Sequence, residues 1–460
     1  MVRLFSHWFP SNTVMQVAFD AILLFLTFMF AGFWLTSGDL PSAGLLPSAL
    51  LFAIAMITLN STVGLYRRDP YRTRVQTVAR VAVSLLLAVP VAYGIFQLMP
   101  WGQGHEVALR ITAVAALGVL VAVRAFVAGR SDSPMFVRRV LVFGTGPEAA
   151  AVEQSLRQSG PGMSIVGFYA VPNSETGHAI APERVFPTSM SLADTACVHD
   201  VHDLIVAVRE RRGGALPLNQ LLECRLAGIR VLDLSSHYER TLGQVRLDTL
   251  HASWLIFGEG FRQGFVRTTV KRLFDIAVSS LMLFVASPIM ILATLLIAME
   301  SGFPVLYRQE RIGQAGRVFR LIKFRSMRRD AENDGKPRWA VSNDERVTRI
   351  GKLLRKVRID ELPQLLNVLK GDMSLVGPRP ERPFFVDTLA REIPFYAARH
   401  SVKPGVTGWA QVRYHYGASV DDAMQKLQYD LYYVKNHTLF LDIVVLFETV
   451  GVVITGKGAQ

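Results

Sequence analysis

The sequence predicts a membrane protein of the α plus α/β class, and three features of the chain lead to this prediction. Half of the 460 residues are hydrophobic and the mean hydropathy is +0.29, which is high for a soluble enzyme. The first 130 residues contain long apolar stretches. Residues 138–236 change to short β-like runs that alternate with helical stretches. The length allows two or three domains.

Four apolar stretches in residues 1–130 predict an N-terminal bundle of four transmembrane helices. Each is close to the ~20 residues that a helix needs to cross the hydrocarbon core, and they cover residues 14–36, 42–65, 78–99 and 107–128. The connectors 66–74 and 129–139 are rich in Arg, whereas the other two connectors contain no Lys or Arg. Because cytoplasmic loops carry the excess of basic residues, both termini are expected on the cytoplasmic side.

A fifth apolar run, residues 271–300, is long enough to cross but is predicted to form a re-entrant membrane helix. Ser287 and Pro288 lie at its centre, and a proline there bends or breaks a helix. Basic residues precede and follow the run, so both of its ends favour the cytoplasmic side. A helix–break–helix that enters and leaves by the same face satisfies both observations. The alternative is an ordinary span with a proline kink.

Residues 138–250 are predicted to form a Rossmann-like cytoplasmic domain. The first strand runs into a glycine-containing turn, Gly144 to Ala149, as in a dinucleotide-binding βαβ unit. Such a site needs an acidic residue at the end of the second strand to hold the ribose hydroxyls, and here no acid occurs until Glu175. Nucleotide binding therefore stays open beside a structural or regulatory role, in which the glycines only make a tight turn.

Positive charge is concentrated directly after the fifth apolar run. Residues 301–380 contain 18 Lys and Arg against 9 Asp and Glu, which is +9 of the chain's net +13. Such a surplus suits nucleic acid, anionic lipid or a phosphate-bearing substrate. Residues 318–327 alternate cations with apolar side chains, so a half-buried strand would hold Lys323 and Arg325 in fixed places. Fixed cations are what a diphosphate needs.

An Asp-Glu pair follows within the same basic segment. Leucines at helical spacing from Leu362 to Leu369 predict a short helix, with Asp360 and Glu361 at its N-terminus. One of the pair could be a simple N-cap. The surrounding cations, and Arg379 between two prolines on a stiff, extended segment, instead favour a phosphate site. A carboxylate kept ionised by a helix dipole, cations and a metal is a competent nucleophile toward phosphorus.

Three motifs carry a specific resemblance to a known family. They are KFRSM at 323–327, RIDELPQLLNVLKGDMSLVGPRPE at 358–381 and VKPGVTGWAQV at 402–412. In this order and spacing they resemble the signature blocks of bacterial polyprenyl-phosphate sugar-1-phosphate transferases, over about residues 268–460. The preceding apolar stretches and Rossmann-like domain resemble the large bacterial subgroup of these enzymes, which initiate exopolysaccharide and O-antigen synthesis.

The resemblance implies a monotopic catalytic domain at residues 268–460, facing the cytoplasm at the bacterial inner membrane. Asp360 would attack the β-phosphate of a UDP-sugar, release UMP and carry the phosphosugar, which undecaprenyl phosphate would then accept. The family's requirement implies Mg²⁺ as the cofactor, with Asp360 also its protein ligand. Glu361 would orient the metal or handle a proton. Ser287 and Pro288 correspond to the family's break in the re-entrant helix.

Phosphate contacts are assigned to Lys323, Arg325 and Arg379. Arg355 and Arg358 are secondary candidates, since basic residues just before a helix are often only solvated. The expected partners are a UDP-sugar, undecaprenyl phosphate and membrane lipids, without nucleic acid. The sequence specifies neither the sugar nor whether the chain forms a homodimer.

Two other classes of function stay open. A nucleotide-sugar oxidoreductase or epimerase would use the Rossmann-like turn, against which the missing ribose acid counts. A non-catalytic membrane scaffold would have no use for the Asp-Glu pair. The C-terminal run 429–456, interrupted by Asp442 and Glu448, is predicted to be an amphipathic helix lying on the membrane, with a full span as the alternative.

Overall fold

The computed structural model describes residues 2–4, 7–9, 11–35, 45–62, 137–158, 163–171, 179–208, 216–250, 264–328, 346–414 and 419–455, with the single residues 66, 84, 118 and 417. The chain divides into two compact units, each described here by itself: Met1–Arg3 with Trp8–Gly243, and Leu4–His7 with Gln244–Gln460. The third and fourth predicted membrane stretches lie outside the described residues, apart from Ser84 and Gly118.

The first two predicted apolar stretches form helices in the first unit. They are α1 (Ser11–Leu35) and α2 (Leu45–Thr62), which follow the short strands β1 (Val2–Leu4) and β2 (His7–Phe9). The two helices pack through a buried cluster in which the rings of Phe28 and Phe52 lie 5.3 Å apart. The outward side chains are also apolar, as at Ile22 and Phe30. α1 is long and apolar enough to cross a membrane, as is α10 of the second unit.

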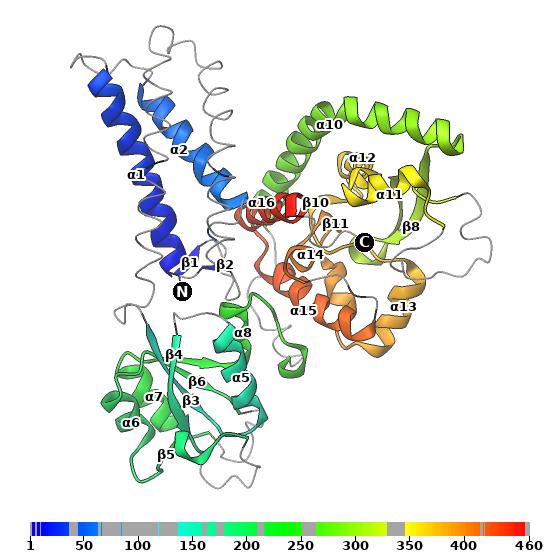
Figure 1. Cartoon of the computed structure of the whole chain (residues 1–460). Helices are drawn as coiled ribbons and strands as arrows, with labels where there is room; N and C mark the ends of the chain where they lie inside the picture. The colour runs from blue at the N-terminus through cyan, green and yellow to red at the C-terminus, as the bar shows by residue number, and fades with distance from the viewer. Residues whose placement is uncertain are drawn as a thin grey trace. The chain divides into compact units, whose positions relative to one another are not determined.

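The first unit also contains a five-stranded parallel sheet with helices on both faces (Figure 1). Alternate residues of its central strand point to opposite faces: Val140 and Val142 pack with α5 and α8, whereas Leu141 packs with α6 and α7. The strand order is β5-β4-β3-β6-β7. In chain order the elements are β3 (Arg138–Phe143), α5 (Pro147–Gln158), β4 (Met163–Tyr169), η3 (Pro182–Arg184), β5 (Val185–Phe186), α6 (Leu192–Val198), β6 (Asp203–Val206), α7 (Leu218–Leu226), β7 (Arg230–Asp233) and α8 (Leu234–Thr241).

The turn after β3 requires a glycine for close packing. Gly144 has a φ of +123°, and a Cβ at this position would lie 2.6 Å from the carbonyl oxygen of Ala207, directly after β6. No side chain can occupy that position. α5 then begins at Pro147, whose ring presets a helical φ. The contact between the ends of two strands is therefore sufficient to explain this glycine.

A 37-residue helix, α10 (Phe265–Ser301), opens the main part of the second unit and runs through Pro288. The sequence predicted two helices separated by a break, whereas the structure forms one helix that bends in its middle (Figure 1). Pro288 has no N–H to donate to the carbonyl of Phe284, one turn earlier. Ser287 donates its hydroxyl to that carbonyl at 2.7 Å. The Ser-Pro pair thus bends the helix without leaving this carbonyl unsatisfied.

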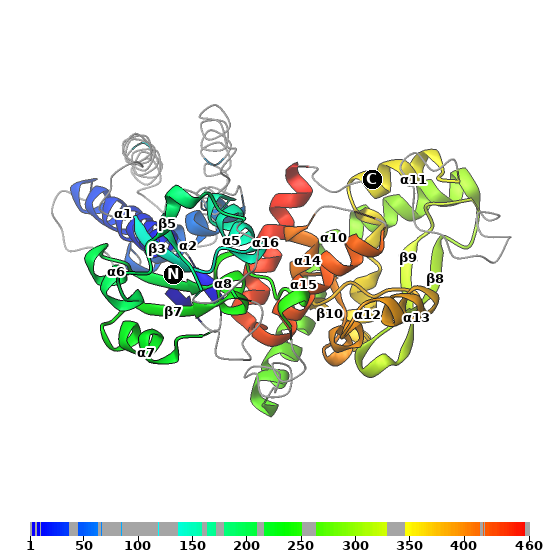
Figure 2. The same cartoon turned by 90° about the horizontal axis from the view of Figure 1, so that it is seen from below.

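Short elements complete the second unit. β8 and β9 lie side by side as an antiparallel hairpin (Figure 2), and β10 pairs in parallel with β11. The core includes the fully buried Trp409, Tyr432 and Tyr433. The elements are η4 (Leu247–Thr249), β8 (Leu306–Ile312), η5 (Gln314–Gly316), β9 (Val318–Phe324), α11 (Arg349–Lys356), η6 (Ile359–Glu361), α12 (Gln364–Lys370), β10 (Ser374–Val376), α13 (Pro383–Glu392), η7 (Tyr396–Ser401), β11 (Gly405–Thr407), α14 (Trp409–Arg413), α15 (Val420–Asn436) and α16 (Leu439–Thr455).

Candidate active site

Glu361 gathers three basic side chains from separate parts of the second unit. Its Oε1 lies 2.9 Å from Nζ of Lys323 on β9 and 2.9 Å from Nη2 of Arg379 in the Pro-Arg-Pro segment. Its Oε2 lies 3.7 Å from Nη1 of Arg358. Burial by itself would raise the pKa of Glu361, but the three positive charges outweigh burial and hold that pKa well below its usual range. Glu361 is therefore ionised at neutral pH.

Asp360 lies next to this cluster, yet none of the described side chains forms an ion pair or hydrogen bond with its carboxylate. The residue is 8% exposed. Burial raises the pKa of Asp360, and the negative charge of Glu361 raises it further. Nearby cations, with Lys323 first, lower the pKa but do not cancel the rise. The two neighbouring carboxylates thus have different partners and pKa shifts of opposite sign.

The backbone of the pair is a 3₁₀ turn. The sequence predicted both carboxylates at the N-terminus of the leucine-rich helix, whereas the structure places them in η6, ahead of α12. The N-cap residue of α12 is Pro363, so neither carboxylate has the simple capping role. Successive side chains of a 3₁₀ turn point about 120° apart, which lets the two reach different surroundings. Arg358, directly before the turn, has a left-handed φ of 56°, at a cost of roughly 1 kcal/mol or more.

Asn367 fixes the strand that carries Lys323. Its side-chain amide accepts the N–H of Ile322 at 3.0 Å and donates to the carbonyl of Arg320 at 2.8 Å. The Asn367 side chain on α12 thereby makes the two hydrogen bonds to the backbone of β9 that a neighbouring strand would make. Asn367 is only 1% exposed. Sequence analysis missed this residue, and its one signal was a polar side chain within an otherwise leucine-rich helix.

The two remaining predicted phosphate contacts have other partners in the structure. Nη2 of Arg325 donates to the carbonyl and the hydroxyl oxygens of Ser301, at 2.9 and 2.8 Å, and so holds the C-terminal end of α10. Nε of Arg355 donates to the hydroxyl of Ser326 at 2.9 Å. The charge of Arg355 still acts on the Asp360–Glu361 pair, here called the dyad, because it lowers the pKa of Asp360.

A buried ion pair that sequence analysis missed anchors α10 to α16. Nζ of Lys271 lies 2.5 Å from Oδ2 of Asp442, and the hydroxyl of Tyr433 donates to Oδ1 of the same carboxylate at 2.6 Å. The sequence interpretation treated Asp442 and Glu448 as polar interruptions of an amphipathic helix. In the structure Asp442 is 1% exposed, and Glu448 pairs with Arg413 at 2.6 Å. Both acids therefore hold elements of the second unit together.

Comparison with known proteins identifies the family. The model of the bacterial sugar transferase family matches residues 266–456, which include the whole dyad cluster. The chain is 41% identical over 191 residues to the uncharacterized sugar transferase EpsL of Bacillus subtilis. This match covers 42% of the chain and 90% of EpsL. The chain belongs to the bacterial sugar transferase family. The resemblance to polyprenyl-phosphate sugar-1-phosphate transferases that the motifs indicated is thereby confirmed.

Other relatives of this sugar transferase are named by the sugar that they transfer. It is 45% identical over 240 residues to the UDP-N-acetylgalactosamine-undecaprenyl-phosphate N-acetylgalactosaminephosphotransferase of Aeromonas hydrophila, over 52% of this chain and 56% of that protein. It is 28% identical over 445 residues to the UDP-glucose:undecaprenyl-phosphate glucose-1-phosphate transferase of Escherichia coli, over 92% of each. The match to the Aeromonas protein thus spans about half of that protein's length.

The predicted Mg²⁺ ion would have few protein ligands at the Asp360–Glu361 dyad of the sugar transferase. Within the described ranges, no group of three or more His, Cys, Asp and Glu side chains is placed to hold a metal. Asp360 offers a carboxylate that no described cation pairs with, whereas Glu361 is engaged by three cations. Mg²⁺ binds through one or two carboxylates, keeps several waters and takes substrate phosphate oxygens. Asp360 is therefore the side chain here best suited to hold the ion.

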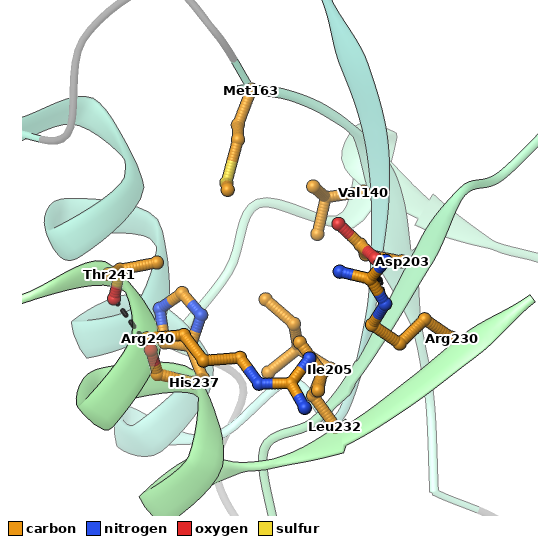
Figure 3. A pocket seen from close by; sticks show the side chains of 9 residues that line it. All are labelled: Val140, Met163, Asp203, Ile205, Arg230, Leu232, His237, Arg240 and Thr241. Carbon is orange, nitrogen blue, oxygen red and sulfur yellow. Dashed lines mark hydrogen bonds and ion pairs between the residues drawn. The ribbon is translucent and has the colours of Figure 1, made fainter. Parts of the chain in front are cut away.

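A cavity lies between the parallel sheet of the first unit and α8 (Figure 3). Three of its lining residues, Met163, Asp203 and Arg230, are the first residues of β4, β6 and β7. Dinucleotides bind at the opposite edge of such sheets, outside the carboxyl ends of the strands. Nε2 of His237, also in the lining, lies 2.8 Å from the hydroxyl of Ser155. The cavity gives no support to an oxidoreductase site.

Neutralising the two carboxylates should change stability in different ways. In Glu361→Gln the partly buried Lys323 and Arg379 lose their shared counter-charge, so we expect a loss of about 1–3 kcal/mol in the free energy of unfolding. Asp360→Asn should be neutral or stabilising. Because the pKa of Asp360 is raised, ionising this carboxyl costs more free energy in the folded than in the unfolded state; above that pKa the charge destabilises the fold, and asparagine removes it.

Unfolding of detergent-solubilised protein at neutral pH, followed by circular dichroism in denaturant, measures both effects. Asp372→Asn, which alters a partly exposed pair with Lys370 at the end of α12, is the control. Equal destabilisation by Asp360→Asn and Glu361→Gln would contradict the division of roles between the two carboxylates.

Proposed function

We propose that this chain transfers a sugar-1-phosphate from a UDP-sugar to undecaprenyl phosphate with release of UMP, and so initiates exopolysaccharide or O-antigen synthesis. The observation that carries the proposal is the asymmetry of the dyad, in which Glu361 binds the cations and Asp360 is left without a described ion-pair partner. The printed names of the Aeromonas and Escherichia relatives support the donor and the acceptor.

In the proposed mechanism Asp360 is the nucleophile. Its carboxylate oxygen bonds to the β-phosphorus of the UDP-sugar while the bond from that phosphorus to the bridging oxygen breaks, and UMP leaves with the electron pair. A phosphate oxygen of undecaprenyl phosphate then attacks the same phosphorus and releases the Asp360 carboxylate. Lys323 and Arg379, held by Glu361, bind the phosphate oxygens. Mg²⁺, when bound, neutralises phosphate charge.

The membrane arrangement is part of the proposal. We infer four N-terminal spans, a re-entrant α10 that returns to the cytoplasmic face, and a catalytic domain on that face of the inner membrane. The bend of α10 supports the re-entrant form (Figure 1), as do the basic residues on both sides of the helix. The bound lipids and a homodimeric state are further proposals.

We further propose that the parallel-sheet domain is a Rossmann-like structural or regulatory domain. Its strand order and its helices on both faces support this proposal. The tight packing at Gly144 accounts for the glycine turn without a nucleotide. An oxidoreductase or epimerase function is therefore the less supported alternative.

Asp360→Asn should abolish UMP release from UDP-sugars while the protein stays folded, because it removes the attacking charge and retains the side-chain size. Wild-type protein incubated with UDP-sugar and Mg²⁺, without lipid acceptor, should carry a phosphosugar mass on the peptide containing Asp360 after rapid quenching. Asp372→Asn is the control and should behave as wild type. A panel of UDP-sugars in the same assay identifies the donor.

Two results together would overturn the covalent mechanism. They are an unmodified Asp360 peptide and initial-rate patterns in which both substrates bind before any UMP leaves. Asp360 would then act only as a metal ligand in a direct transfer.

Cysteine labelling tests the re-entrant helix. Thr268→Cys and Phe303→Cys, placed near the two ends of α10 in a background lacking Cys197 and Cys224, should both react only from the cytoplasm. Gln103→Cys, in a connector expected on the other side, is the periplasmic control. Labelling of either α10 position from the periplasm would establish an ordinary kinked span.

A further inference from the structure

The segment that carries Arg379 has few backbone donors with which to hold its shape. Pro378 and Pro380 flank the arginine, and proline has no N–H. The segment can therefore be fixed mainly through its carbonyl groups. The orientation of the Arg379 carbonyl matters most, because it is set by the ψ angle of the residue whose guanidinium reaches Glu361.

Donors from three other elements hold these carbonyls. The backbone N–H of Gly405 on β11 donates to the carbonyl of Pro378 at 3.0 Å. Nη2 of Arg399, in η7, donates to the carbonyl of Arg379 at 2.8 Å. Nη1 of Arg311, on β8, donates to the carbonyl of Pro380 at 3.1 Å. The carbonyls of Pro378, Arg379 and Pro380 are thus all held by groups distant in sequence.

Arg399 is itself held in a buried frame. Its Nη2 lies 2.8 Å from Oδ2 of Asp430, and the two side chains are 7% and 3% exposed. Its Nη1 donates to the hydroxyl of Tyr396 at 2.6 Å. Asp430 on α15 therefore holds the guanidinium that reaches the Arg379 carbonyl.

We propose that Arg399 and Asp430 form a positioning pair that fixes the backbone of Arg379, so that its guanidinium lies against Glu361 and the diphosphate of the donor. This inference rests on the proposed sugar-phosphate transfer. Neither residue contacts the dyad in any interaction that the structure describes. Their effect passes through the carbonyl of Arg379, and it should be seen in donor binding and turnover.

The test is a double-mutant cycle between Arg399→Lys and Arg379→Ala. Lysine keeps the positive charge beside Asp430 but lacks the planar fork that also reaches Tyr396 and the Arg379 carbonyl. In the wild-type background, Arg399→Lys should lower kcat/KM for the UDP-sugar roughly 10- to 100-fold, since misplacing a binding group by about 1 Å has an effect of this size. In the Arg379→Ala background it should change kcat/KM by less than about 2-fold.

Arg413→Lys is the matched control, because Arg413 also forms an ion pair with an acid in the second unit, at 2.6 Å from Glu448. It should leave the donor KM near the wild-type value. If Arg399→Lys fails to fold, Tyr396→Phe, which removes only the hydroxyl that orients Nη1, should give a smaller effect with the same dependence on Arg379.

Each outcome decides the inference. Equal effects of Arg399→Lys in both backgrounds, or unchanged kinetics in the wild-type background, would show that the pair only stabilises the fold and would overturn the positioning role. In those cases the wild type still releases UMP, and the proposed function stands. Wild-type protein that releases no UMP from any UDP-sugar would overturn the proposed function and this inference with it.

Discussion

The ion pairs of Glu361 are the interaction on which the site depends. They join β9 through Lys323, the Pro-Arg-Pro segment through Arg379 and the start of η6 through Arg358. β9 and the Pro-Arg-Pro segment are separated in sequence from η6, and among the described residues β9 pairs only with β8. A partly buried carboxylate with several charge-assisted bonds can hold such segments together, and removing it leaves uncompensated cations. The geometry around Asp360 therefore depends on its neighbour.

The same cluster separates the properties of two adjacent carboxylates. Glu361 is kept ionised by its cations, whereas burial and the charge of Glu361 raise the pKa of Asp360. Pairs of titratable groups with opposite shifts are characteristic of sites in which the members have different roles. In the proposed mechanism, this difference gives Glu361 the structural role and leaves Asp360 for chemistry. The 3₁₀ turn makes the separation possible, because it points the two side chains in different directions.

Sequence analysis predicted the parts of this site that depend on local pattern. The alternation of residues 318–327 predicted the strand that carries Lys323, and the confirmed family resemblance rests on the dyad and Pro-Arg-Pro motifs. It could not predict contacts between distant segments. Arg325 occupies an equivalent position to Lys323 in the alternating sequence, yet Lys323 pairs with Glu361 whereas Arg325 binds Ser301 at the end of α10. Asp442 is paired with Lys271 across 171 positions, and only the tertiary fold determines such a pair.

The most direct test of the account is the pH dependence of UMP release in the wild type and in Glu361→Gln. Asp360 must be ionised to attack, so activity should fall as the pH drops through its raised pKa. Removing the negative charge of Glu361, and freeing its cations to act on Asp360, should lower that pKa. The account predicts that the acid limb of the residual activity moves to lower pH in Glu361→Gln. An acid limb that stays in place or moves to higher pH would contradict it.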